Sequence, residues 1–175
     1  MDIKLILKNI VKTDLTISVS GLSLNTNTLN KGDVFVALQG EKTHGIDFIE
    51  NAIEKGCVAV VIDGKDFDCS VPTIRIDNLR AYLPMLAQNF YNKANNVDLI
   101  AVTGTNGKTS VSHYISQLLD FLETDNGVIG TLGMSKTENK SINTTPDIFS
   151  IYSTLEEYSS IKVNIAVIEL QSPLY

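Results

Sequence analysis

The sequence is poor in the features that mark membrane, disulfide-rich or nucleic-acid-binding proteins. Its two cysteines, Cys57 and Cys69, do not have the spacing of metal ligands, so we expect plain thiols in a reducing cytoplasmic compartment. No apolar run is long enough to cross a membrane, and the N-terminus lacks the cleavage pattern of a signal peptide. With 14 basic and 20 acidic residues the net charge is −6, which argues against a nucleic-acid-binding surface.

The sequence does contain a regular alternation of apolar strands and amphipathic helices. Of its 175 residues 43% are hydrophobic, enough to bury one ordinary core or two small ones. The alternation predicts an α/β fold with largely parallel sheets. Predicted strands cover residues 16–21, 34–38, 58–62, 73–76, 99–102 and 163–168. Predicted helices start near residues 47, 77, 108 and 145, and a short one lies within residues 1–11.

A polar segment divides the chain into two parts. Residues 92–98, NKANNVD, have no apolar period, and they separate two series of predicted strands and helices. We place a domain boundary there, which gives a first domain of residues 1–95 and a second of residues 96–175.

The strongest chemical signal is residues 100–110, IAVTGTNGKTS. An apolar run passes through a glycine-containing turn into an amphipathic helix, which is the setting of a phosphate-binding loop. Gly104 and Gly107 would let several backbone amides point at one anion, next to the positive end of the helix. Lys108 would reach the β- and γ-phosphates of a nucleotide, and Thr109 would hold Mg²⁺. The alternative is an ordinary strand–turn–helix corner, but packing alone seldom requires a Gly-x-x-Gly-Lys-Thr turn.

Four segments of the chain resemble the Mur ligase family. The turn TGTNGKT at residues 103–109 is similar to its ATP loop, and residues 32–61 are similar to its uridine-nucleotide-binding domain. GVIGTLG at residues 127–133 and NTTPD at residues 143–147 resemble one branch, the MurE type, which adds the third residue of the peptidoglycan stem peptide. The resemblance implies a small N-terminal α/β nucleotide-sugar-binding domain, followed by the first part of a P-loop parallel-sheet ATPase domain.

The resemblance also implies a reaction. ATP would phosphorylate the terminal carboxylate of UDP-N-acetylmuramoyl-L-alanyl-D-glutamate. The amine of an incoming amino acid would attack the acyl phosphate, and an amide would form with release of ADP and phosphate. ATP and Mg²⁺ would be the cofactors, and UDP-N-acetylmuramoyl-dipeptide and an amino acid the partners, with no nucleic acid or membrane. We expect a monomer.

The resemblance assigns the ATP and metal contacts to the loop and to one strand end. Lys108 would be the catalytic residue, because it neutralises charge on the transferred phosphoryl group. Glu169, at the end of the strand 163–168, would join Thr109 in holding Mg²⁺. The residues expected to contact ATP are Gly104, Thr105, Asn106, Gly107, Lys108, Thr109 and Ser110.

The expected contacts to the muramoyl substrate lie elsewhere. Asn143, Thr144 and Thr145 match family positions that hold the muramoyl-dipeptide, and Thr26 matches a serine that contacts the uridine nucleotide. For Thr145 a structural role is equally good: it could be the N-cap of a helix with Pro146 in its first turn.

Three segments depart from the family pattern. The usual Asp-Ser-Arg reads Asn-Thr-Asn at residues 25–27, Asp-Gly-His reads His-Gly-Ile at residues 44–46, and Glu-Val-Ser-Ser-His reads Glu-Leu-Gln-Ser-Pro at residues 169–173. The family's carbamylated lysine, adenine pocket and amino-acid-binding domain have no counterpart, so we expect an incomplete ligase that is inactive alone. Two alternatives stay open: a nucleotide-binding remnant without catalysis, and another member of the family, of the MurF type or similar to folylpolyglutamate synthases.

Overall fold

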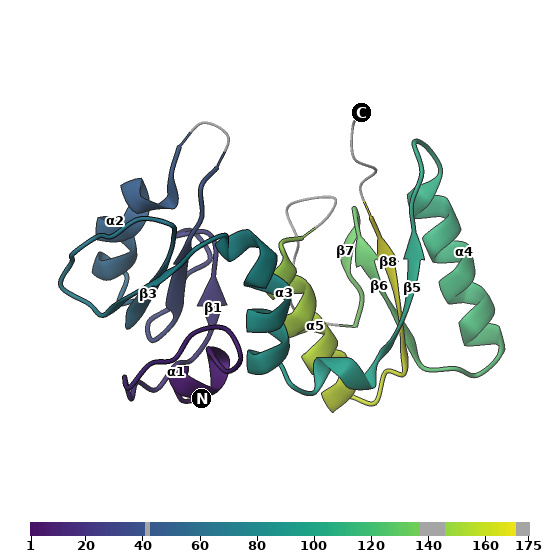
Figure 1. Ribbon diagram of the computed structural model, residues 1–175. Helices are drawn as coiled ribbons and strands as arrows, with labels where there is room; N and C mark the ends of the chain where they lie inside the picture. Colours follow the sequence, from purple (N-terminus) through teal and green to yellow (C-terminus); the bar gives the residue numbers. More distant parts are fainter. Residues whose placement is uncertain (41–42, 137–145, 171–175) are drawn as a thin grey trace. The chain divides into compact units, whose positions relative to one another are not determined.

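The computed structural model describes residues 1–40, 43–136 and 146–170. The chain forms two compact units, Met1–Phe90 and Tyr91–Tyr175 (Figure 1). Each unit has its own four-stranded sheet, with the strand order β1-β2-β3-β4 in the first and β5-β8-β6-β7 in the second. Helices and mainly parallel strands alternate along both units, which is the α/β architecture that the sequence predicts.

The sheet of the first unit is parallel throughout, and its two central strands are its most buried part. All four residues of β2 are buried, as are the first four of β3, which suits parallel strands covered on both faces. The strands are β1 (Leu22–Ser23), β2 (Val34–Ala37), β3 (Ala59–Asp63) and β4 (Thr73–Ile76). The helices are α1 (Ile3–Ile6), the 3-10 helix η1 (Gly45–Phe48), α2 (Ile49–Glu54) and α3 (Leu79–Phe90).

The first strand of this unit lies later in the chain than we predicted. Residues 16–21 do not form a strand of the sheet; instead, the amide of Ile3 donates to the carbonyl of Ile17, and that of Val19 donates to Met1. The apolar alternation there comes from packing against the start of the chain. The strand of the sheet is Leu22–Ser23, where both residues are buried.

The second unit places its most apolar strand inside the sheet. β8 (Ile165–Glu169) pairs in parallel with β5 (Asp98–Val102) on one side and with β6 (Asn126–Gly130) on the other (Figure 1). This confirms the interior position that its sequence predicts. The other elements are η2 (Ala94–Asn96), α4 (Lys108–Phe121), the antiparallel edge strand β7 (Gly133–Met134) and α5 (Ile148–Ser160).

The N-cap of α5 is Asp147, so the prediction that Thr145 caps this helix is wrong. The Asp147 carboxylate accepts hydrogen bonds from the amides of Phe149 at 3.0 Å and Ser150 at 3.2 Å. A carboxylate satisfies two exposed amides and also interacts favourably with the positive end of the helix, which explains why the helix begins after Asp147.

The state of the cysteines and the character of the helices were also predicted from the sequence. Both cysteines are free thiols, Cys57 buried and Cys69 half-buried. Among the described residues, no helix combines the length and the apolar character that a membrane span requires.

Candidate nucleotide-binding site

The predicted phosphate loop joins the carboxyl end of β5 to the start of α4. Gly104 has φ 147° and Gly107 has φ 78°, both in the region that favours glycine. A Cβ on Gly107 would meet no atom within 4 Å, so glycine is needed there for backbone conformation and not to avoid crowding. Because Gly107 is the N-cap of α4, no side chain at the cap accepts from the first amides of the helix. Those amides are therefore available to an anion.

Lys108 lies across this loop. Its Nζ donates to the carbonyl of Gly104 at 2.7 Å, so its ammonium group is held over the turn. Thr105, Asn106 and Ser110 are exposed around it. The structure therefore brings the seven residues predicted to contact ATP into one turn and the first turn of a helix, with the charged group on the loop.

Glu169, the last residue of β8, has a fully buried side chain next to the loop. Its partner in the register of β5 is Val102, the last residue before the predicted loop. Thr109 donates its hydroxyl to Glu169 Oε2 at 2.9 Å. The two residues predicted to hold a metal are therefore in direct contact, although 60 positions separate them in sequence.

Two more hydroxyl groups donate to the same carboxylate. Thr131, between β6 and β7, donates to Glu169 Oε2 at 3.0 Å. Ser112, one turn along α4, is fully buried and lies 3.1 Å from Glu169 Oε1. Sequence reasoning assigned no role to either residue. The available signals were the spacing of Ser112, three residues after Thr109 on the same helix face, and the position of Thr131 within GVIGTLG.

The glycines of GVIGTLG make room for buried side chains. A Cβ on Gly130 would overlap the Glu169 carboxylate, and one on Gly127 would overlap the ring of Tyr158. Burial raises the pKa of Tyr158 to about 12, and its hydroxyl donates to the carbonyl of Ser135 at 2.6 Å. The motif thus lets Glu169 and Tyr158 pack against β6.

In the first unit, Thr26 lies on a polar loop after β1. Ser23 fastens this loop by donating to the carbonyl of Asn25 at 2.8 Å and by contacting the Thr28 hydroxyl at 3.1 Å. Lys55, at the end of α2, donates to the carbonyl of Thr26 at 2.7 Å. The Thr26 side chain is half-buried on this fixed loop.

His44 is a helix cap. Its Nδ1 accepts from the amide of Ile46 at 3.1 Å and so caps η1, which precedes α2. The helical segment predicted to start near residue 47 therefore begins at Gly45, and Asp47 lies inside its first turn and is not the cap. The imidazole takes the capping role that an aspartate could fill, which accounts structurally for one departure from the family pattern.

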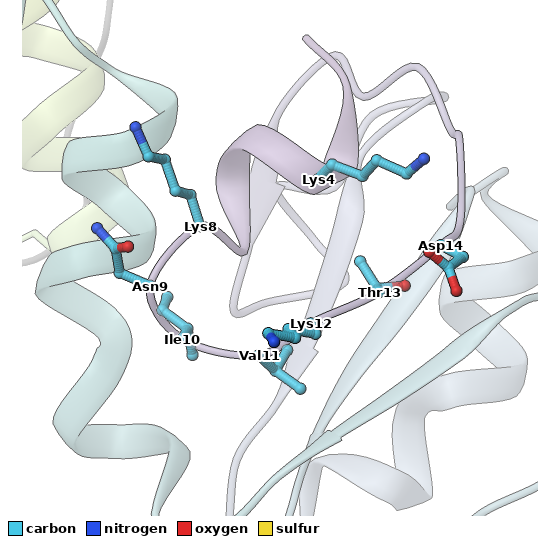
Figure 2. Close-up of a pocket in the computed structure, with 8 residues that line it drawn as sticks. All are labelled: Lys4, Lys8, Asn9, Ile10, Val11, Lys12, Thr13 and Asp14. Atoms are coloured by element: carbon cyan, nitrogen blue, oxygen red, sulfur yellow. The ribbon is translucent and has the colours of Figure 1, made fainter.

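Three predicted substrate contacts cannot be placed, and one cavity lies apart from the predicted site residues. Asn143, Thr144 and Thr145 lie outside the described residues. A cavity of about 550 Å³ lies along the loop after α1, and none of the predicted site residues lines it. Figure 2 shows that two of its three lysines, Lys4 and Lys8, point in different directions, so they do not converge on one anion.

Two family profiles match the chain. The profile described as "Mur ligase family, catalytic domain" matches residues 18–91, and "Mur ligase middle domain" matches residues 102–173. The UDP-N-acetylmuramoyl-L-alanyl-D-glutamate--2,6-diaminopimelate ligase 2 of Clostridium acetobutylicum is 34% identical over 186 residues, which cover 98% of this chain and 38% of that protein. The UDP-N-acetylmuramyl-tripeptide synthetase of Tropheryma whipplei is 31% identical over 163 residues, covering 88% of this chain and 31% of that protein. The chain thus spans about a third of the length of these relatives.

Solved structures are similar to the chain in fold. A UDP-N-acetylmuramoyl-L-alanyl-D-glutamate--2,6-diaminopimelate ligase superposes with a TM-score of 0.75 at 23% identity, covering 97% of this chain and 36% of that one. The MurF ligase of Thermotoga maritima, in complex with ADP, superposes with a TM-score of 0.57 at 25% identity, covering 93% of this chain and 34% of that one. These similarities confirm the predicted α/β fold.

Proposed function

The chain belongs to the Mur ligase family, and from this premise we propose that it carries the uridine-nucleotide-binding and ATP-binding parts of a MurE-type ligase. Residues 1–95 would form the first part and residues 96–175 the second. The ligase reaction would join an amino acid to UDP-N-acetylmuramoyl-L-alanyl-D-glutamate at the expense of ATP.

The observation that carries this proposal is the contact between Thr109 and Glu169 at the phosphate loop. A threonine hydroxyl and a carboxylate supply hard oxygen atoms, which are the ligands that Mg²⁺ prefers. A buried carboxylate among hydroxyl donors suits such an ion, because these donors can rotate when a cation arrives. Mg²⁺ held here by Thr109 and Glu169 would neutralise charge on the ATP phosphates.

Lys108 and the loop amides supply the rest of the charge neutralisation. The ammonium group now donates to the neutral carbonyl of Gly104. A phosphate oxygen accepts a stronger, charge-assisted bond, so the lysine exchanges partners when ATP binds. The Gly107 cap leaves the first amides of α4 for the same phosphates.

These groups suit phosphoryl transfer to a carboxylate. A substrate carboxylate oxygen attacks the γ-phosphorus, the bond from that phosphorus to the β,γ-bridging oxygen breaks, and ADP leaves. The amine then attacks the acyl carbon and phosphate departs. Protein groups contribute chiefly position and positive charge, which is what such transfers require.

The substrate contacts in this proposal involve both parts. Thr26, on its fixed loop, would contact the uridine nucleotide, and Asn143, Thr144 and Thr145 would hold the muramoyl-dipeptide. The support for Thr26 is the tether from Lys55, which fixes its backbone from a separate element.

Replacing the loop lysine tests the proposal. We expect wild-type protein to bind ATP in the presence of Mg²⁺, and Lys108→Ala to bind it roughly 10- to 100-fold more weakly, as for a lost charged hydrogen bond. Isothermal titration calorimetry measures both affinities. The control is Lys93→Ala, an exposed lysine of the second unit outside the loop, which should match wild type. Equal affinity of wild type and Lys108→Ala would refute the assignment.

A further inference from the structure

The carboxylate of Glu169 is held on both of its oxygen atoms. Thr109 and Thr131 donate to Oε2, while Ser112 lies within hydrogen-bond distance of Oε1. Glutamate has a broad terminal torsion, so a carboxylate anchored at one oxygen can still turn about that anchor. A donor at each oxygen fixes the plane of the group. Of these three hydroxyl residues, Ser112 is the one within hydrogen-bond distance of Oε1.

The position of Ser112 is itself fixed. Its Oγ lies 2.9 Å from the carbonyl of Thr109 on the same helix and 3.1 Å from Glu169 Oε1. One hydroxyl hydrogen can be donated to only one of these acceptors at a time. The buried hydroxyl therefore has an acceptor whether its hydrogen points to Glu169 or to Thr109. A metal can therefore bind without leaving a buried donor unsatisfied.

Thr131 anchors the carboxylate from a different element. Its hydroxyl reaches Oε2 from the turn between β6 and β7, whereas Ser112 reaches Oε1 from α4. The Thr131 residue is exposed, so changing its side chain removes a donor without disturbing the core. Ser112 is fully buried, but alanine at this position differs from serine only by the oxygen.

We propose that Ser112 and Thr131 are positioning residues that clamp the two oxygens of Glu169 and thereby set the Mg²⁺ affinity of the nucleotide site. Neither residue is a metal ligand in this proposal; each acts through Glu169. The inference rests on the proposed function, since it concerns the same metal. Partners of metal-binding carboxylates commonly have this role, and their removal typically costs about 10- to 100-fold in metal affinity.

The test compares ATP binding with and without the metal on the full chain. ATP binding is titrated at increasing MgCl₂ and, separately, in EDTA. We expect Ser112→Ala and Thr131→Ala each to raise the half-saturating Mg²⁺ concentration roughly tenfold while leaving the affinity in EDTA unchanged. Thr131→Ser, which keeps the hydroxyl, should restore the wild-type Mg²⁺ requirement.

A matched control separates positioning from general stability. Ser116 lies one turn further along α4 and donates to Asn126 Oδ1 at 2.6 Å, away from Glu169. Ser116→Ala should lose a comparable hydrogen bond and keep the wild-type Mg²⁺ requirement. The proposal is overturned if Ser112→Ala and Thr131→Ala also keep that requirement, or if they weaken binding equally in EDTA. Absence of Mg²⁺-dependent ATP binding in wild type would instead overturn the proposed function.

Discussion

Each unit contains a buried carboxylate packed against a glycine, but the two carboxylates have different kinds of partner. Asp33 in the first unit is 5% exposed and accepts from the backbone amide of Asn30 at 2.8 Å. Glu169 in the second unit is 0% exposed and accepts from three side-chain hydroxyls, two on α4 and one in the turn between β6 and β7. A Cβ on Gly21 would lie 2.6 Å from Asp33 Oδ1, and one on Gly130 would overlap Glu169.

The difference separates a structural acid from a candidate functional one. Asp33 stabilises the turn that runs from Asn30 to Asp33, and its donor, the backbone amide of Asn30, is held in place by the chain. The donors to Glu169 come from positions 38 to 60 residues distant and are hydroxyls, which can reorient around a cation. Burial alone therefore does not identify a functional carboxylate, and the two acids differ in the kind of donor that surrounds them.

The largest expected effect comes from neutralising each acid in turn. Glu169→Gln keeps the size of the side chain and removes its charge, so we expect it to abolish the Mg²⁺-dependent part of ATP binding. Asp33→Asn should leave that binding at the wild-type level. Titration calorimetry with and without Mg²⁺ measures both variants. If Asp33→Asn also loses the Mg²⁺-dependent part of ATP binding, the distinction between a structural Asp33 and a metal-binding Glu169 is wrong.

Filling the space beside each acid should destabilise both units and affect nucleotide binding in only one. Gly21→Ala and Gly130→Ala each place a methyl group against a buried carboxylate, and we expect a loss of about 1–3 kcal/mol in the free energy of unfolding. Only Gly130→Ala should also weaken Mg²⁺-dependent ATP binding, because it displaces Glu169. Urea unfolding and ATP titration provide the two measurements. An unchanged ATP affinity in Gly130→Ala would show that the position of Glu169 does not matter.

The sequence predicts those strands and turns that depend on a local pattern of residues. Apolar runs identify β2, β3, β4, β5 and β8, and the Gly-x-x-Gly-Lys-Thr turn identifies the loop before α4. The place of Glu169 at the end of an apolar strand is also visible in the sequence, whereas its expected metal-binding role came from the resemblance to the Mur ligase family.

Side-chain contacts between segments that are distant in sequence cannot be predicted from such local patterns. Ser112 and Thr131 meet Glu169 only after β6 and β8 pair and α4 packs on the sheet. The spacing of Ser112 from Thr109 and the place of Thr131 within GVIGTLG mark these residues, but neither signal names Glu169 as their partner. Competition between neighbouring residues explains the error at the start of α5. Thr145 and Asp147 are both good N-caps, and the aspartate, with two amides in reach, sets the helix start.

The smallest expected effect is a pH dependence that belongs to Asp33. Burial raises the pKa of this carboxyl above its usual value of 3.8, and the amide of Asn30 offsets part of that rise. Between 3.8 and the raised pKa, the folded state binds more protons than the unfolded state, so the free energy of unfolding falls as pH rises through this window. Asp33→Asn removes the titrating group and should flatten this slope. Urea unfolding of wild type and Asp33→Asn from pH 4 upward measures the difference, and parallel slopes would mean that Asp33 does not carry this dependence.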